Sequence, residues 1–167
     1  EKFTNFINSK DPNAESYFNL GNVLVQMGDV QRAISAYKMA VELKPNDINA
    51  LYNLANIYDL LGRMNEAEEL YLKVIKTNAN FDLAYSRLGA LYFKKDNVIK
   101  AKEMYEQAIK INPESALTYF QYGYILEKTG GLVKAAQIYQ KASDLDPQNA
   151  EISYNLGNVY ISLKDLS

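Results

Sequence analysis

AESYFNLGNVLVQMGDVQRAISAYKMAVELKPND, residues 14–47, is one period of a pattern that fills almost the whole chain. Its Leu20-Gly21 pair returns every 34 residues, as Leu54-Ala55, Leu88-Gly89, Tyr122-Gly123 and Leu156-Gly157. A fixed period of this length is typical of solenoids, in which each unit buries its apolar face only by stacking on its neighbours. We therefore expect function to lie on a surface that the repetition builds, and not in an enclosed pocket.

Each period contains two apolar patterns with helical spacing, separated by a short turn. In residues 14–47 the first pattern is Tyr17, Leu20, Gly21 and Leu24, and the second is Ala33, Ile34, Tyr37, Ala40 and Val41. Gly28 suits the end of the first helix because glycine takes positive φ without a Cβ clash, and Lys44-Pro45-Asn46-Asp47 ends the second. Because every linker is short, the helices are predicted to pack antiparallel with their neighbours in the chain.

The composition limits the classes of function. The chain has 167 residues, 48% of them apolar, which is enough for one folded body with a substantial core. Its net charge of −2 supplies no general attraction for nucleic acid or anionic lipid, so neither is expected as a partner. No apolar run approaches the length of a membrane span, and no signal-peptide pattern opens the sequence. The lack of cysteine is compatible with a reducing interior, and we expect an intracellular location, cytoplasmic or nuclear.

Catalysis has little support in the residue types. There is no histidine or cysteine, so the commonest general base, the thiol nucleophile and the usual zinc ligands are missing. No glycine-rich phosphate loop occurs. We predict a non-catalytic chain without metal or cofactor, which can belong to an enzyme only as its substrate-recruiting arm.

The residues at fixed places in the period resemble the tetratricopeptide repeat (TPR), a helix-turn-helix of 34 residues. With Ala14 as position 1, the small residue at position 20 is Ala33, Ala67, Ala101 and Ala135, and the aromatic residue at position 24 is Tyr37, Tyr71, Tyr105 and Tyr139. Proline ends the period at Pro45, Pro113 and Pro147, and Ala79 departs from this rule. The resemblance implies an all-α fold, a right-handed α-α superhelix (TPR solenoid) of antiparallel helix pairs, with repeats at 14–47, 48–81, 82–115 and 116–149.

Both ends of the chain stop inside a repeat. Residues 1–13 are similar to the second helix of a truncated preceding repeat, because Phe3 and Phe6 stand one period before Tyr37 and Ala40. Residues 150–167 match the first helix of a truncated fifth repeat. We therefore predict a fragment of a longer superhelix, whose exposed apolar end faces favour end-to-end self-association.

The first helix of each repeat leaves one face outside the core, at positions 2, 5, 9 and 12 with 6 and 13 at its margin, and we call it the groove face. The predicted peptide-binding residues on it are Phe18, Asn19, Asn22, Tyr52, Asn53, Asn56, Arg87, Phe120, Gln121, Tyr124, Tyr154, Asn155 and Asn158. The same face also carries Val25, Asp59, Phe93, Glu127 and Ile161. An asparagine amide offers donors and an acceptor, so a column of them can bind the backbone of an extended peptide. The alternative is that these asparagines serve local hydrogen bonds and helix packing. The tyrosines at positions 4 and 24 are expected in the core, with their hydroxyls reaching the surface.

We predict a protein-protein interaction scaffold that binds extended peptide or protein segments in a concave groove. The pairs Asn19/Asn22, Asn53/Asn56 and Asn155/Asn158 resemble the asparagine ladder in the TPR superhelix of O-linked N-acetylglucosamine transferases, which implies a substrate-recruiting arm. Arg87, Ala90, Gln121 and Tyr124 interrupt that ladder in the third and fourth repeats.

Two other classes stay open: a structural subunit of a large assembly, such as a ubiquitin ligase or ciliary-transport complex, and a chaperone adaptor. TPR adaptors that bind acidic chaperone termini hold them with a clamp of basic and asparagine residues. Asn22, Asn53 and Arg87 match that clamp, but Phe18 and Leu83 replace its two lysines and remove much of the charge that holds a carboxylate.

Overall fold

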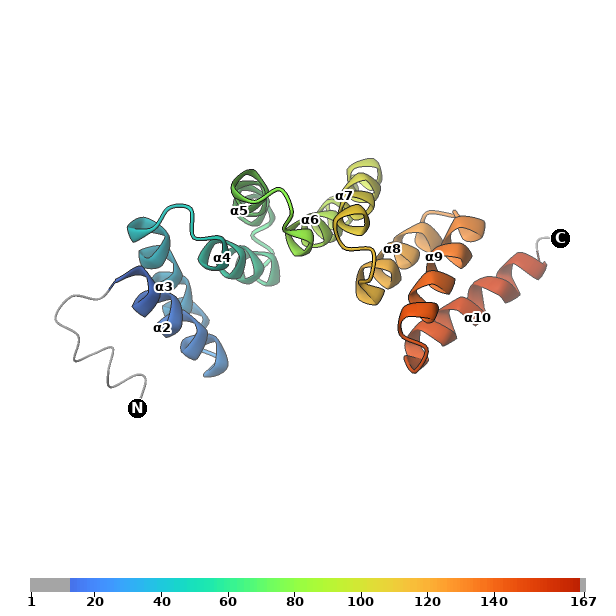
Figure 1. The fold of residues 1–167 in the computed structure, drawn as a ribbon, viewed down its shortest axis with the longest axis horizontal. Helices are drawn as coiled ribbons and strands as arrows, with labels where there is room; N and C mark the ends of the chain where they lie inside the picture. Colours follow the sequence, from blue (N-terminus) through green and yellow to red (C-terminus); the bar gives the residue numbers. More distant parts are fainter. Residues whose placement is uncertain (1–12, 166–167) are drawn as a thin grey trace. The chain divides into compact units, whose positions relative to one another are not determined.

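The computed structural model describes residues 13–165, and this part of the chain is helical without strands (Figure 1). It divides into two compact units, Glu1–Ala79 and Asn80–Ser167. The helices of the first unit are α2 (Ala14–Gln26), α3 (Val30–Leu43), α4 (Ile48–Leu60) and α5 (Met64–Thr77). Those of the second are α6 (Asp82–Lys94), α7 (Val98–Ile111), α8 (Ala116–Lys128), α9 (Leu132–Leu145) and α10 (Ala150–Asp165). The predicted all-α class of paired helices is confirmed. The helix expected in residues 1–13 lies outside the described part of the chain, except for Asn13.

The turns inside the helix pairs repeat one backbone conformation. Gly28, Gly62 and Gly130 have φ of 76°, 72° and 79°, and Asp96 takes the same place in the third pair with φ of 59°. In this left-handed region a Cβ is crowded, so glycine is favoured and aspartate is tolerated. The next helix begins two residues later, and in α3 and α7 its first turn is capped by the side chains of Asp29 and Asn97.

In three of the described helix pairs a core tyrosine ring lies against a glycine, and in the α4–α5 pair Ala55 holds the same position. The four tyrosines at position 24 are at most 2% exposed. A Cβ added to Gly21 would lie 2.5 Å from Tyr37 Cε1, and one added to Gly123 would lie 2.6 Å from Tyr139 Cδ1. The small residue at position 8 is therefore required by close contact with the second helix of the same pair.

The first helix of the fifth repeat, α10, lacks this contact at position 8. A Cβ added to Gly157, which holds position 8 in α10, would meet nothing within 4 Å. Tyr160, three residues later, is 51% exposed, whereas its counterpart Leu126 in α8 is 2% exposed. One face of α10 packs on α9 through Ile152 and Val159, and the face carrying Gly157 and Tyr160 is open.

Candidate peptide-binding surface

In the first unit, three helices are joined by one hydrogen-bonded group on the groove face. Tyr37 Oη of α3 donates to Asn22 Oδ1 of α2 at 2.6 Å, and Asn53 Nδ2 of α4 donates to the same oxygen at 3.1 Å. Asn53 Nδ2 also lies 3.4 Å from Tyr37 Oη. Burial raises the pKa of the Tyr37 hydroxyl, and the hydrogen bond with Asn53 offsets part of this effect. The hydroxyl thus stays protonated and acts as a donor to Asn22.

The next period repeats the tyrosine-to-asparagine bond, since Tyr71 Oη donates to Asn56 Oδ1 at 2.7 Å. The expectation that the position-24 hydroxyls reach the surface is therefore corrected: Tyr37 and Tyr71 are buried, and these hydroxyls point at groove-face amides. The alternative of local hydrogen bonding applies to the oxygens of Asn22 and Asn56. Within residues 13–165, Asn22 Nδ2, Asn53 Oδ1 and Asn56 Nδ2 have no hydrogen-bond partner.

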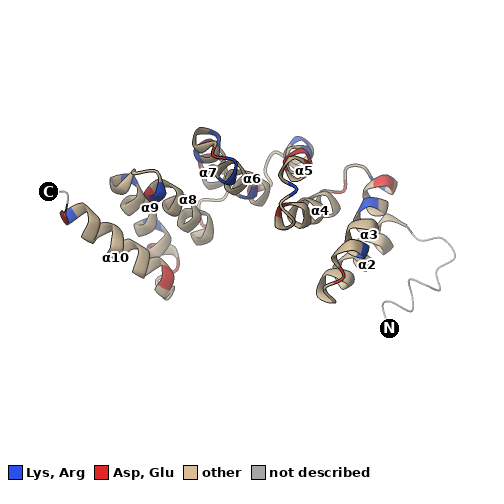
Figure 2. Ribbon diagram, turned by 180° about the vertical axis from the view of Figure 1, so that it is seen from behind, with Lys and Arg blue, Asp and Glu red and all other residues tan. Residues whose placement is uncertain are grey.

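The aromatic residues predicted for this face lie partly in the core. The Phe18 ring packs on Tyr37 with a centroid distance of 5.9 Å, and the Tyr52 ring packs on Tyr71 at 6.0 Å. Phe18 and Tyr52 are half-buried, so each offers the remainder of its ring to solvent. Charge is sparse here, because α2 and α4 carry one acidic residue each and no basic one (Figure 2). Apart from Glu15 and Asp59, the first unit presents a face of uncharged amides and ring edges.

The second unit uses other partners for its tyrosines. Ala90 stands where Asn22 and Asn56 stand in the first unit, and Tyr105 stacks on Tyr122 with centroids 5.8 Å apart and planes 9° from parallel. The Tyr122 hydroxyl donates to Glu106 Oε1 at 2.6 Å, and Lys134 Nζ donates to the same oxygen at 2.9 Å. These bonds lower the pKa of Glu106, so its carboxylate is ionised well into the acid range.

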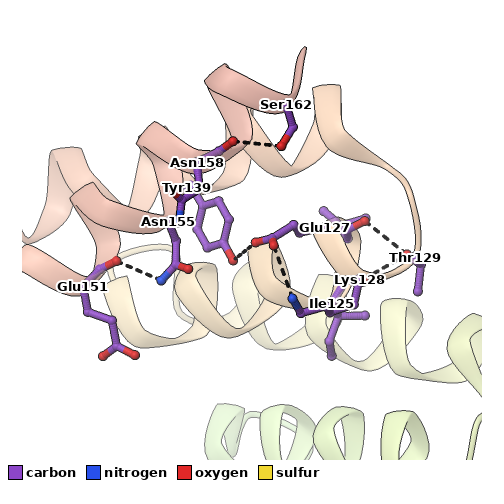
Figure 3. A network of polar contacts seen from close by, with 10 residues as sticks. Ile125, Glu127, Lys128, Thr129, Tyr139, Glu151, Asn155, Asn158 and Ser162 are labelled. Carbon is purple, nitrogen blue, oxygen red and sulfur yellow. Dashed lines mark hydrogen bonds and ion pairs between the residues drawn. The ribbon is translucent and has the colours of Figure 1, made fainter. Parts of the chain in front are cut away.

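The Tyr139 hydroxyl donates to a carboxylate, Glu127 Oε2, at 2.9 Å (Figure 3). Burial raises the pKa of Tyr139, and the neighbouring Glu127 adds to the rise. Asn155 of α10 donates to the backbone carbonyl of Glu151 in its own helix at 2.9 Å, so one of its amide hydrogens is used locally. In the first unit the tyrosine hydroxyls donate to asparagine amides, whereas in α8 the acceptor is the carboxylate of Glu127.

None of the thirteen predicted groove residues is buried. Asn19, Arg87, Tyr124 and Tyr154 are exposed, and the others are half-buried. Asn22 and Asn53 are brought into direct contact, whereas Phe120 packs on Tyr139 at 5.8 Å. The prediction did not foresee that tyrosine hydroxyls orient these side chains. The signal was present in the constant tyrosine at position 24, whose hydroxyl reaches the asparagine at position 9 in the first two repeats.

No group of three or more acidic side chains in residues 13–165 is placed to hold a metal ion. Within the same described residues, every helix is too short or too polar to cross a bilayer.

Family models match nearly the whole described region. A model of the TPR repeat matches residues 21–62 and 132–163, and models of the tetratricopeptide repeat match 48–81, 83–115 and 104–137. The chain belongs to the tetratricopeptide repeat family. No curated protein matches it significantly.

Solved TPR structures share the fold. The MamA protein matches with a TM-score of 0.79 and 27% identity, over 88% of this chain and 80% of that one. YrrB, described as a TPR protein with an unusual peptide-binding site, matches with a TM-score of 0.77 and 26% identity, over 98% and 84% of the two chains. MamA from Desulfovibrio magneticus RS-1, residue 41 to the end, gives 0.82 and 25% over 94% and 89%. These similarities support a protein-interaction scaffold in general terms.

Proposed function

We propose that this TPR chain is a non-catalytic scaffold that binds extended peptide or protein segments on its groove face. One observation carries the proposal: buried tyrosine hydroxyls fix the amide oxygens of Asn22 and Asn56. An amide held in this way rotates less freely, so its remaining N–H donors favour one direction before a ligand arrives. Such pre-organisation reduces the entropy lost on binding.

The available groups suit a peptide backbone. Asn22 Nδ2 and Asn56 Nδ2 are donors for peptide carbonyls, and Asn53 Oδ1 is an acceptor for a peptide N–H. The exposed parts of Phe18 and Tyr52 add apolar contact area. Because the face is nearly uncharged, binding to the first unit should depend little on salt. The peptide-binding site named for YrrB, which is 26% identical, supports the same assignment.

The proposal is tested by selecting binders from a displayed library of random peptides and measuring their affinity calorimetrically. Asn56→Ala should weaken binding about two- to tenfold, the equivalent of one hydrogen bond. Gln31→Ala, on the exposed side of α3, is the matched control and should leave the affinity unchanged. Circular dichroism checks that both variants fold. Failure to select any peptide, or equal affinities for the three proteins, would refute the proposal.

A second proposal concerns the open face of α10, which we infer receives a helix of another copy. Tyr160 is 51% exposed where Leu24, Tyr58, Tyr92 and Leu126 are 1–7% exposed, and Gly157 leaves room for a ring. Removing this apolar surface from water favours association. Light scattering should show a mass that rises with concentration, and Tyr160→Asp should abolish the rise. A constant monomer mass for the unmodified chain would reject this contact.

A further inference from the structure

The groove face of the second unit contains an acid beside an exposed aromatic ring. Tyr124 and Glu127 are three residues apart in α8, so their side chains lie on the same side of the helix. The Tyr124 ring is 44% exposed, and its position is supported by the Phe93 ring of α6, whose plane is 82° from that of Tyr124 at a centroid distance of 6.4 Å. The Glu127 carboxylate is oriented by the hydroxyl of Tyr139 (Figure 3).

A cation of the chain itself already occupies the space between these two groups. Lys128 Nζ lies 3.4 Å from Glu127 Oε1 and 5.2 Å from the centroid of the Tyr124 ring. An ammonium ion at this place is attracted by the carboxylate and by the face of the ring. The contact shows that the position accepts a positive charge.

The interactions of Lys128 with Glu127 and the Tyr124 ring are weak. Glu127 and Lys128 are adjacent in a helix, where neighbouring side chains diverge, and the Lys128 side chain is 50% exposed. Exposed ion pairs of this kind contribute little, because water solvates both charges and a long side chain loses freedom. A ligand cation can therefore replace Lys128 at small cost.

No other first helix combines the two features. At the places of Tyr124 and Glu127, α2, α6 and α10 have no acid, and α4, which has Asp59, has Asn56 in place of the ring. The combination is confined to α8.

We propose that Tyr124 and Glu127 form a subsite for a basic side chain, lysine or arginine, of a peptide bound on the groove face of the second unit. This subsite rests on the proposed peptide-binding function and adds its specificity. Arginine fits best, since its planar guanidinium stacks on the Tyr124 ring while its N–H groups bond both oxygens of a carboxylate. The displaced Lys128 ammonium moves into solvent.

The test compares peptides selected from one random displayed library by the full chain and by Glu127→Gln. The glutamine amide oxygen still accepts the Tyr139 hydroxyl, so the fold is kept while the charge is removed. The unmodified chain should enrich peptides with lysine or arginine at one fixed position, and Glu127→Gln should enrich peptides without this preference. Glu103→Gln, an exposed acid of α7, makes the same change in net charge and should keep the preference.

A selected peptide then serves as a quantitative probe. Replacing its basic residue by norleucine should weaken binding to the unmodified chain about five- to tenfold and to Glu127→Gln less than twofold. Lys128→Ala should tighten binding of the basic peptide, because the internal competitor is gone. Peptides enriched without any basic preference, or an equal norleucine effect in both proteins, would overturn the subsite and leave the scaffold function standing. No enrichment at all would overturn both.

Discussion

Gly123→Ala and Gly157→Ala place the same methyl group at position 8 of two successive first helices and should have opposite effects. In a helix interior, alanine is favoured over glycine by about 1 kcal/mol. At Gly157 nothing lies within 4 Å of the new Cβ, so the protein should gain up to about 1 kcal/mol. At Gly123 the new Cβ lies 2.6 Å from the Tyr139 ring, and overpacking of this kind costs about 1–3 kcal/mol.

With an overpacking cost in the lower half of that range, the net loss for Gly123→Ala should be up to about 1 kcal/mol, and the two variants should differ by about 1–2 kcal/mol. Ala55, which holds position 8 in α4, indicates that a helix pair can be spaced for a methyl group, so the lower half of the overpacking range is appropriate. In a Tyr139→Leu background the cost of Gly123→Ala should shrink, because the ring is gone.

Amide hydrogen exchange in α8, α9 and α10 is the suitable assay, because solenoids open locally and a single unfolding free energy is poorly defined for them. Guanidinium titration followed by far-UV circular dichroism gives a second measure. Equal effects of the two substitutions would refute the idea that ring contact keeps position 8 small. A loss of stability in Gly157→Ala would show that another helix covers α10.

Three further predictions concern protonation and backbone conformation. Burial raises the pKa of Tyr139. The neutral hydroxyl therefore contributes in full to the free energy of unfolding below pH ~10, the unfolded pKa, and above this pH its contribution falls by at most about 1.4 kcal/mol per pH unit. Tyr139→Phe should reduce the slope of the unfolding free energy against alkaline pH. Hydrogen bonds from Tyr122 and Lys134 lower the pKa of Glu106, so its contribution is present above the unfolded value of 4.5 and is lost as pH falls through the folded value; Glu106→Gln should flatten the acid limb of a urea-stability series. Asp96→Gly should raise stability by about 0.5–1 kcal/mol, because aspartate holds φ of 59° where glycine is unstrained; no rise in the thermal midpoint would contradict this account.

The fold followed from the sequence because its cause is local and repeated. Helix spacing, turn residues and the small residue at position 8 recur every 34 residues. A repeat in which one of these signals is missing can therefore still be assigned from the signals in the neighbouring repeats. The departure at Lys95-Asp96-Asn97, which has no glycine, still forms the same turn. What the spacing could not show is that Gly21 and Tyr37 are a contacting pair, since the distance between two helices depends on packing and not on periodicity.

The groove face was predictable as a set of positions and only partly as chemistry. Asn22 and Tyr37 were assigned separately, one to the surface and one to the core, because a sequence does not show how far a buried hydroxyl reaches. The partner of Tyr139 was missed for a related reason. Tyr124 replaces asparagine at position 9 of α8, and the Tyr139 hydroxyl donates instead to Glu127, one turn further along this helix.

Most of the packing in each unit is between helices that are neighbours in the chain, with smaller contacts between successive first helices, as between α6 and α8 and between Asn22 of α2 and Asn53 of α4. Native contacts therefore form without closing long loops, which keeps the entropic barrier to folding low. During synthesis, a helix pair emerging from the ribosome already has its preceding partner available and does not wait for the carboxyl terminus. Folding can thus keep pace with translation, one period at a time.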